Sequence, residues 1–403
     1  MSLVEFGSIS HIQKGKKPFR QTNVPTEGYS PYVDIEAFET GNIKMYANGE
    51  KCLPCKNGDI LIVCDGSRSG FVGRAIDGYV GSTLAIIKAD GMLPEYLYYF
   101  LQGRYALLNT KKKGTGTPHL DVNVLNQQKL AVPSYKEQKR IVARIEELFS
   151  KLDSGVETLK KAKQQLAVYR QSVLKAAFEG RITKHQHCDE KLDWALGGEI
   201  NSLPTIPSEW RYIALSKLGE LGRGKSKHRP RNDPKLFVGG KYPFLQTGDV
   251  KAAKQCIIEY SKMYGEFGLQ QSKLWPKGTL CITIAANIAE TAFLGIDACF
   301  PDSVVGFVPY ECIDPKYIKY FIESQKLRLW AFAPATAQKN INLDTLENLI
   351  VPYCSLEEQR AVIAEIESRL SVCDSIEKTV DAALQQAESM RQSILKKAFE
   401  GEL

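Results

Sequence analysis

Hydrophobic residues recur at alternating steps of three and four along two long stretches of the chain. This spacing places them on one stripe of a helix and, when it continues over many turns, is typical of a coiled-coil seam. Nine of the eleven stripe positions in each stretch are apolar. In the first stretch the positions are Val142, Ile145, Phe149, Leu152, Val156, Leu159, Lys163, Leu166, Arg170, Val173 and Ala177. In the second they are Ile363, Ile366, Leu370, Cys373, Glu377, Val380, Leu384, Ala387, Arg391, Ile394 and Ala398.

The residues around both stretches provide ends for two long helices, which we predict at residues 134–180 and 353–403. Each helix begins after a turn that contains proline, with Glu137 or Glu358 in its first turn, where the helix dipole favours an acidic side chain. Each ends at a glycine, Gly180 or Gly401, which can adopt the left-handed conformation that closes a helix. Roughly 43–45 residues make a helix about 65 Å long.

Two arrangements of these helices fit the pattern. The chain could dimerise through a coiled coil, or the two helices could pair antiparallel inside one chain, which we favour because both follow equivalent segments. The polar seam residues Lys163, Arg170, Glu377 and Arg391 would then fix the register at some cost in stability. A second apolar flank is not needed by a two-helix seam, so we expect it to face another protein. Its candidate partner-binding residues are Ile141, Leu148, Phe178, Met390 and Phe399.

The chain is a tandem repeat. Residues 391–401 match residues 170–180 at nine of eleven positions, with an offset of 221. The same offset carries Glu137-Gln138 onto Glu358-Gln359, and weaker matches extend upstream. Each half therefore consists of one variable segment followed by one well-preserved helix.

The variable segments alternate short apolar runs with turns rich in Gly, Pro and Asp, which is typical of mixed α/β domains. Strands are predicted at residues 59–64, 84–88, 280–285 and 304–308, and helices at 94–108 and 315–330. We divide the chain into domain 1–133, helix 134–180, linker 181–208, domain 209–352 and helix 353–403. The predicted fold class is α+β, with two mixed domains joined by an antiparallel intramolecular coiled coil in a pseudo-twofold tandem repeat.

Composition adds few constraints. The chain has 403 residues, 43% of them hydrophobic, which is typical of globular proteins. No apolar run is long enough to span a bilayer and no secretory signal is recognisable, so we expect a cytoplasmic protein that does not bind membranes. The ten cysteines are then reduced, and Cys52 and Cys55 lack a second pair at zinc-binding distance. The net charge of +7 permits nucleic-acid binding without requiring it.

Basic residues cluster in turn-rich loops at matching places in both halves. Lys, Arg, Gln and Asn side chains in such loops suit contacts to phosphates and base edges, although a charge run can also be a solvated surface. The candidate DNA-binding residues of the first half are Lys14, Lys16, Lys17, Arg20, Arg68, Lys111, Lys112 and Lys113. Those of the second half are Arg223, Lys225, Lys227, Arg229, Arg231, Gln338 and Lys339.

No catalytic motif accompanies these clusters. Residues 219–226 match the P-loop pattern, but no buried strand precedes them and the prolines that follow disfavour the helix whose amides would bind phosphate. The Pro-Pro-Tyr motif of adenine methyltransferases and a nuclease carboxylate cluster are both absent from the sequence. We expect no catalytic residue, metal or cofactor in this chain.

The repeated motifs resemble those of the specificity (S) subunit of Type I restriction-modification systems. The resemblance rests on a Leu-x-Val-Pro segment end, a Glu-Gln helix start and the closing Arg-Gln-Ser-Ile/Val-Leu-Lys-x-Ala-Phe-Glu-Gly motif, each present twice. It implies two target-recognition domains that read a bipartite asymmetric site in double-stranded DNA, with the helix pair as a spacer.

The resemblance also implies partners. Two methylation (M) subunits with S-adenosylmethionine and up to two restriction (R) subunits with ATP and magnesium would form an adenine-N6 methyltransferase and ATP-dependent endonuclease complex. The chain itself would be non-catalytic. An alternative is a coiled-coil scaffold with two protein- or peptide-binding domains. A salt titration of binding to random duplex DNA separates the two, because only phosphate neutralisation gives a steep slope.

Overall fold

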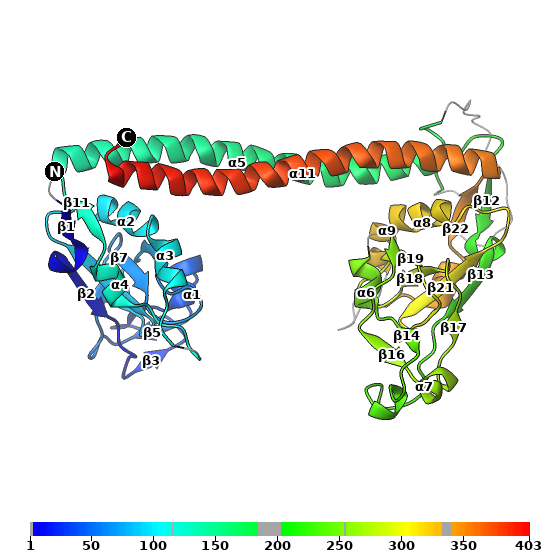
Figure 1. The fold of residues 1–403 in the computed structure, drawn as a ribbon, viewed down its shortest axis with the longest axis horizontal. Helices are drawn as coiled ribbons and strands as arrows, with labels where there is room; N and C mark the ends of the chain where they lie inside the picture. Colours follow the sequence, from blue (N-terminus) through cyan, green and yellow to red (C-terminus); the bar gives the residue numbers. More distant parts are fainter. Residues whose placement is uncertain (1–2, 115, 184–202, 254, 333–339) are drawn as a thin grey trace. The chain divides into compact units, whose positions relative to one another are not determined.

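The computed structural model describes residues 3–114, 116–183, 203–253, 255–332 and 340–403. The chain forms two compact units, one of residues 1–161 with 380–403 and one of residues 162–379. Each unit holds one globular domain and parts of two long helices, α5 (Tyr135–Phe178) and α11 (Leu356–Glu400). Both helices and the mixed α/β composition of the domains are confirmed (Figure 1).

The described residues of the first domain form three sheets. An antiparallel sheet has the order β2 (Ser10–Lys14), β10 (Leu84–Ala89), β7 (Ile60–Val63) and β8 (Val72–Arg74). A mixed sheet has the order β3 (Gln21–Thr22), β5 (Tyr46–Ala47), β4 (Ser30–Val33), β9 (Gly78–Val80) and β6 (Pro54–Cys55). The pair β1 (Leu3–Glu5) and β11 (Lys129–Ala131) joins the ends of the domain. Its helices are η1 (Phe6–Ser8), α1 (Ile35–Thr40), α2 (Pro94–Gln102), α3 (Tyr105–Thr110) and α4 (Val122–Asn126).

The second domain repeats this plan. Its main sheet has the order β13 (Gly219–Arg223), β21 (Val304–Pro309), β18 (Leu280–Thr283), β19 (Thr291–Leu294) and β15 (Cys256–Ile257). A second sheet has the order β16 (Lys262–Tyr264), β14 (Tyr242–Phe244), β20 (Ala298–Cys299) and β17 (Leu274–Trp275). The end pair is β12 (Arg211–Ala214) with β22 (Ile350–Tyr353). Its helices are η3 (Leu215–Lys217), η4 (Pro234–Leu236), α6 (Thr247–Ala252), α7 (Glu266–Gln270), α8 (Pro315–Ser324), α9 (Lys326–Phe332) and α10 (Leu343–Glu347).

The four predicted strands are β7, β10, β18 and β21, each of which has four consecutive buried residues. The two predicted domain helices are each broken in two, α2–α3 and α8–α9. The first break falls at Gly103, where a Cβ atom would lie only 3.3 Å from the Cβ of Leu395 on α11. Glycine therefore ends α2 at a place where the long helix approaches it closely.

The predicted seam is confirmed, because all of its positions on α5 and α11 are buried or half-buried. The helices run antiparallel within each unit. In the second unit the Arg170 guanidinium lies 2.6 Å from the Asp374 carboxylate, and Lys163 lies 3.6 Å from Glu377. In the first unit Arg391 pairs with Asp153, at the position equivalent to Arg170 with Asp374. Such exposed pairs contribute about 1 kcal/mol or less each, so they fix the register more than the stability.

The expectation that Ile141, Phe178 and Phe399 face another protein is wrong. Ile141 is 7% exposed and Phe178 only 4%, each within the hydrophobic core of its own unit. The Phe399 ring packs on Tyr96 of α2, with ring centroids 4.9 Å apart. The physical reason is that helices α2 and α8 must cover their own apolar faces, and they do so with this flank of the long helices. Leu148 is half-buried and Met390 remains 48% exposed.

Within the described part of the chain, no helix combines the length and the apolar character needed to cross a membrane.

Candidate nucleic-acid interface

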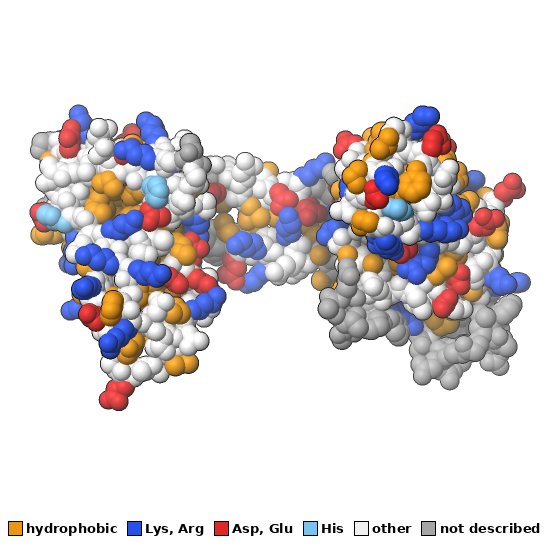
Figure 2. Space-filling model, turned by 90° about the horizontal axis from the view of Figure 1, so that it is seen from below, with side chains coloured by type: hydrophobic (Ala, Val, Ile, Leu, Met, Phe, Trp, Pro, Cys, Tyr) orange, Lys and Arg blue, Asp and Glu red, His pale blue; other side chains and the backbone are white. Residues whose placement is uncertain are grey.

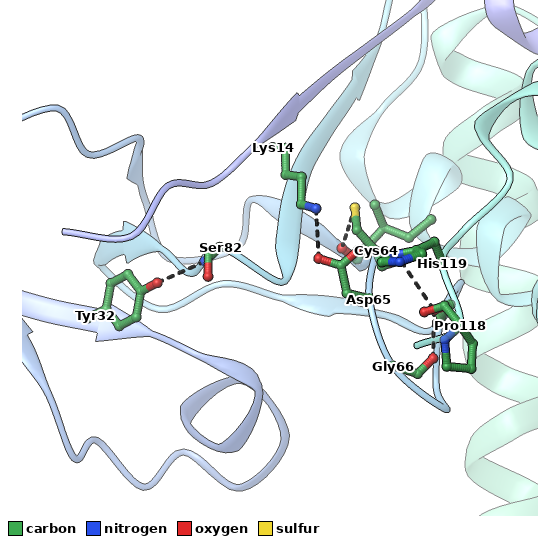
Figure 3. A network of polar contacts seen from close by, with 10 residues as sticks. Lys14, Tyr32, Cys64, Asp65, Gly66, Ser82, Pro118 and His119 are labelled. Atoms are coloured by element: carbon green, nitrogen blue, oxygen red, sulfur yellow. Dashed lines mark hydrogen bonds and ion pairs between the residues drawn. The ribbon is translucent and has the colours of Figure 1, made fainter. Parts of the chain in front are cut away.

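The first candidate surface is built from loops that meet beyond the ends of β2 and β7. Lys14 is the last residue of β2, and Asp65 lies two residues beyond the end of β7. The Lys14 ammonium lies 2.7 Å from one oxygen of the Asp65 carboxylate, and Nδ1 of His119 lies 2.7 Å from the other (Figure 3). A cation, a carboxylate and an imidazole thus converge on one exposed point of the domain.

Backbone contacts hold these loops in place. Asp65 and His119 form an antiparallel bridge, and the Gly66 amide donates to the Pro118 carbonyl at 2.8 Å. The Asn109 side chain donates to the carbonyls of Ser67 and Ser69, at 2.9 and 3.1 Å. The loop after β7 and the loop before α4 therefore form one preorganised surface.

The charge of Asp65 is stabilised at this point. Partial burial alone would raise the pKa of its carboxyl, but the hydrogen bonds from Lys14 and His119 hold that pKa below its ordinary value. Asp65 thus stays ionised, and the lone pairs that Lys14 and His119 leave free can accept from the amino group of cytosine.

The other predicted residues of the first domain divide into two groups. Some are engaged within the domain: Arg68 pairs with Glu39 at 2.6 Å, Lys112 donates to the Ser67 carbonyl at 3.1 Å, and Lys113 pairs with Asp121 at 3.0 Å. The rest are exposed and, among the described residues, have no side-chain partner. These are Lys16, Lys17, Arg20 and Lys111.

The second domain shows the same division. Two guanidinium groups converge on residue Asp302: Arg231 donates to both carboxylate oxygens at 2.8 Å, and Arg223 to the backbone carbonyl at 3.0 Å. The Arg229 guanidinium folds back onto the His228 carbonyl at 2.9 Å. Lys225 and Lys227 are exposed and have no side-chain partner in the described part of the chain.

Two of the predicted residues, Gln338 and Lys339, lie outside the described residues. Neither Asp65 nor Asp302 belongs to the predicted set, because an isolated acid next to a strand carries no sequence signal of its own.

The second domain has a loop junction equivalent to that of the first. Ala285, two residues beyond the end of β18, forms an antiparallel bridge with Asn340. This bridge matches the one between Asp65 and His119, with offsets of 220 and 221 residues between the halves. The two domains therefore present different side chains at the same place in the same fold. Lys and Arg side chains are spread over the face of each domain that lies away from the long helices α5 and α11 (Figure 2).

The exposed lysines should contact phosphates. We expect Lys225→Ala combined with Lys227→Ala to reduce the slope of log K against log salt by about 1.8, if each lysine neutralises one phosphate. Filter binding or fluorescence anisotropy with random duplex DNA measures this slope. The matched control is Lys160→Ala with Lys161→Ala on α5, which changes the charge equally but should leave the slope unchanged. An unchanged slope in the Lys225 and Lys227 variant would place the DNA elsewhere.

A family model and similar sequences identify the same protein family. The family model described as "Type I restriction modification DNA specificity domain" matches residues 1–166 and 207–386. The Type I restriction enzyme EcoBI specificity subunit of Escherichia coli is 26% identical over 389 residues, covering 93% of this chain and 80% of that protein. The MjaVIII specificity subunit of Methanocaldococcus jannaschii is 24% identical over 397 residues, covering 91% and 85%.

Solved structures share the fold. A chain from a study of complex assembly in the type I R-M system matches with a TM-score of 0.74 at 20% identity, covering 100% of this chain and 98% of that one. The HsdS subunit from Thermoanaerobacter tengcongensis matches with a TM-score of 0.53 at 20% identity, covering 100% and 97%.

Proposed function

The chain belongs to the family of type I restriction-modification DNA specificity proteins, and on this premise we propose that each of its two target-recognition domains reads one half of a bipartite, asymmetric DNA site. As a specificity subunit, the chain supplies sequence recognition and is a non-catalytic component of its system. The helices α5 and α11 would then act as the spacer between the two half-sites.

One observation supports this proposal most directly. The same loop junction occurs in both domains but carries Asp65 with His119 in one and Ala285 with Asn340 in the other. A carboxylate accepts from cytosine, whereas an Asn amide can pair with adenine. Equivalent positions with different hydrogen-bonding groups would give two different half-site preferences, which is what an asymmetric site needs.

Methylome sequencing of a host that carries this chain with its methylation subunit tests the proposal. We expect one bipartite motif in which two short specific sequences flank a gap of unspecified bases. Changing Asp65→Ala should alter the preference in one half only. Methylation without a bipartite motif, or a change in both halves, would contradict the proposed division of labour.

The partners would carry the chemistry. Two methylation subunits would bind S-adenosylmethionine and methylate adenine, and up to two restriction subunits would use ATP and magnesium for translocation and cleavage, all in the cytoplasm. Among the described residues of this chain, no group of three or more His, Cys, Asp or Glu side chains could hold a metal ion.

A group of exposed apolar residues outside the predicted flank is a suitable docking surface for a methylation subunit. On α11, Val372 is 57% and Ile376 44% exposed, one helical turn apart. Tyr169 of α5 is also exposed and interacts with Arg369, which lies on α11 one turn before Val372. These residues replace Phe178 and Phe399 as candidate contacts, and Met390 remains one.

We expect Val372→Asp combined with Ile376→Asp to abolish co-purification with the methylation subunit while the chain stays folded. Exposed substitutions of this kind change stability by about 0.5 kcal/mol or less, whereas a charge in an apolar interface is strongly unfavourable. Affinity co-purification measures binding, and circular dichroism measures folding. Ser371→Asp with Ser375→Asp is the matched control on the neighbouring face of α11. Retained binding in the Val372 and Ile376 variant would exclude this flank as the docking surface.

A further inference from the structure

A fully buried glutamine lies in the first turn of each long helix. Gln138 has no exposed surface, and its side chain makes three hydrogen bonds to backbone groups. Its amide oxygen accepts from the Leu93 N–H at 2.7 Å, and its amide nitrogen donates to the carbonyls of Gly91 and Pro133 at 2.7 and 2.9 Å. One side chain thus connects the start of α5 to the start of α2 and to the end of the segment that follows β11.

The same arrangement occurs in the second unit. Gln359 is also fully buried, accepts from the Asp314 N–H at 2.9 Å, and donates to the carbonyls of Cys312 and Cys354 at 3.2 and 2.9 Å. The six bonds correspond pair by pair between the two halves. The Glu-Gln motif that the repeat analysis found is therefore a structural joint and not only a helix start.

A tyrosine on α2 in the first unit and one on α8 in the second unit add a further hydrogen bond to each joint. Tyr99 donates to the Glu146 carboxylate at 3.4 Å, and the equivalent Tyr320 donates to Glu367 at 3.3 Å. Burial, with the nearby carboxylate, raises the pKa of Tyr99 to about 12, so its hydroxyl remains a donor at physiological pH. These bonds run between the domain and the fourth turn of the long helix.

The end of the other long helix fills the opposite side of each joint. Phe399 of α11 packs on Tyr96 and Phe100 in the first unit, with ring centroids 4.9 and 5.5 Å apart. Phe178 of α5 packs in the same way in the second unit. Each domain is therefore held by the beginning of one helix and the end of the other.

A joint made only of apolar side chains would bury comparable surface without fixing a direction. Apolar contacts are non-directional, whereas three hydrogen bonds from one planar amide to three backbone groups in two different segments define an orientation. Each of those backbone groups also needs its partner, because an unpaired buried polar group is costly. The buried amide therefore favours a single angle between domain and helix.

We propose that Gln138 and Gln359 are positioning residues that fix the angle between each target-recognition domain and its long helix, and thereby restrict the subunit to one gap between the two half-sites. This inference rests on the proposed function, since a gap has meaning only for a bipartite site. It assigns gap selectivity to two side chains that lie far from the candidate DNA-binding loops in the fold of each domain.

The test uses the full chain assembled with its methylation subunit and a DNA library in which both half-sites are constant and the gap varies by single base pairs. The variants are Gln138→Met and Gln359→Met, which keep the length of the side chain and remove its hydrogen bonds. We expect the preference for the native gap over gaps one base pair longer or shorter to fall roughly tenfold, which corresponds to about 1.4 kcal/mol. The base preference within each half-site should stay unchanged, which a general loss of stability would not predict.

Gln164→Met and Gln385→Met are matched controls, since both glutamines are exposed on the same helices. Gln138→Glu is a second variant. Its carboxyl, when protonated, still accepts from the Leu93 N–H and donates to one of the two carbonyls, so it should give an intermediate loss of gap preference. Native gap preference in folded Gln138→Met and Gln359→Met complexes would overturn the proposal. So would failure of all Gln138 variants to give a soluble subunit, because the residue would then hold the fold together. If the wild-type complex itself methylates no bipartite site, the proposed function is at fault and not the joint.

Discussion

Replacing Phe178 by alanine is expected to lower the free energy of unfolding of the second unit by about 3–5 kcal/mol. The side chain is 4% exposed and packs edge-on against Tyr317 and Phe321, with ring centroids 5.1 and 5.2 Å away. Removing the ring takes away buried apolar surface and leaves a cavity that the neighbouring rings fill only by moving. Urea denaturation of the purified chain, followed by circular dichroism, measures the change.

Val168→Ala is the control for this experiment. Val168 lies on the same helix but is 68% exposed, so its truncation should change the free energy of unfolding by about 0.5 kcal/mol or less. If Phe178→Ala unfolded at the same urea concentration as the unchanged chain, the ring would contribute nothing to the fold. Phe178 would then again be a candidate for contact with a partner.

Phe178 also shows what a hydrophobic pattern can and cannot predict. The period of three and four identified the seam positions correctly, because a coiled coil buries residues that are close neighbours along each helix. The same pattern predicts that the second flank is buried, but it does not predict which residues cover it. Phe178 is covered by α8 and Phe399 by α2 of the same chain, through contacts between residues that are far apart in sequence.

The candidate interface was predictable to a similar extent. Basic residues in matching loops could be found from sequence, and Lys16 and Lys225 are exposed as a phosphate contact requires. The ion pair of Lys14 with Asp65 joins residues 51 positions apart, and that of Arg231 with Asp302 joins residues 71 apart. Such pairs depend on which strand ends meet, and local pattern carries no information about that.

The buried glutamines illustrate a third case. Gln138 and Gln359 were visible as a repeated motif, yet a glutamine in a first helical turn is ordinarily a solvated residue. Only the packing of α2 and α8 against the long helices turns these side chains into fully buried hydrogen-bonding groups. A repeated polar pair at a helix start therefore indicates that these positions have a specific role. It does not indicate which contacts their side chains make.

Lengthening both long helices by one heptad should widen the gap between the half-sites by roughly three base pairs. Seven residues add about 10 Å at 1.5 Å per residue, and DNA rises about 3.4 Å per base pair. Insertions after Lys160 and after Asp381 keep the seam in phase and fall near the middle of both helices. Each domain keeps its own joint, so the recognised half-sites themselves should not change. Methylome sequencing of a host carrying the variant measures the new gap.

A four-residue insertion at the same two places separates the effect of helix length from the effect of the heptad phase of the seam. It would break the heptad phase of the seam at the insertion points and locally unwind the coil. The ion pairs Arg170 with Asp374 and Arg391 with Asp153 would each keep their partner, because both members of a pair lie on the same side of the insertions, but the apolar stripe would no longer be continuous between the two pairs. We expect little or no methylation from that variant, whereas the seven-residue variant stays active although the added twist of the DNA weakens its binding. An active seven-residue variant that still recognises the original gap would show that the helices do not set the distance between the half-sites.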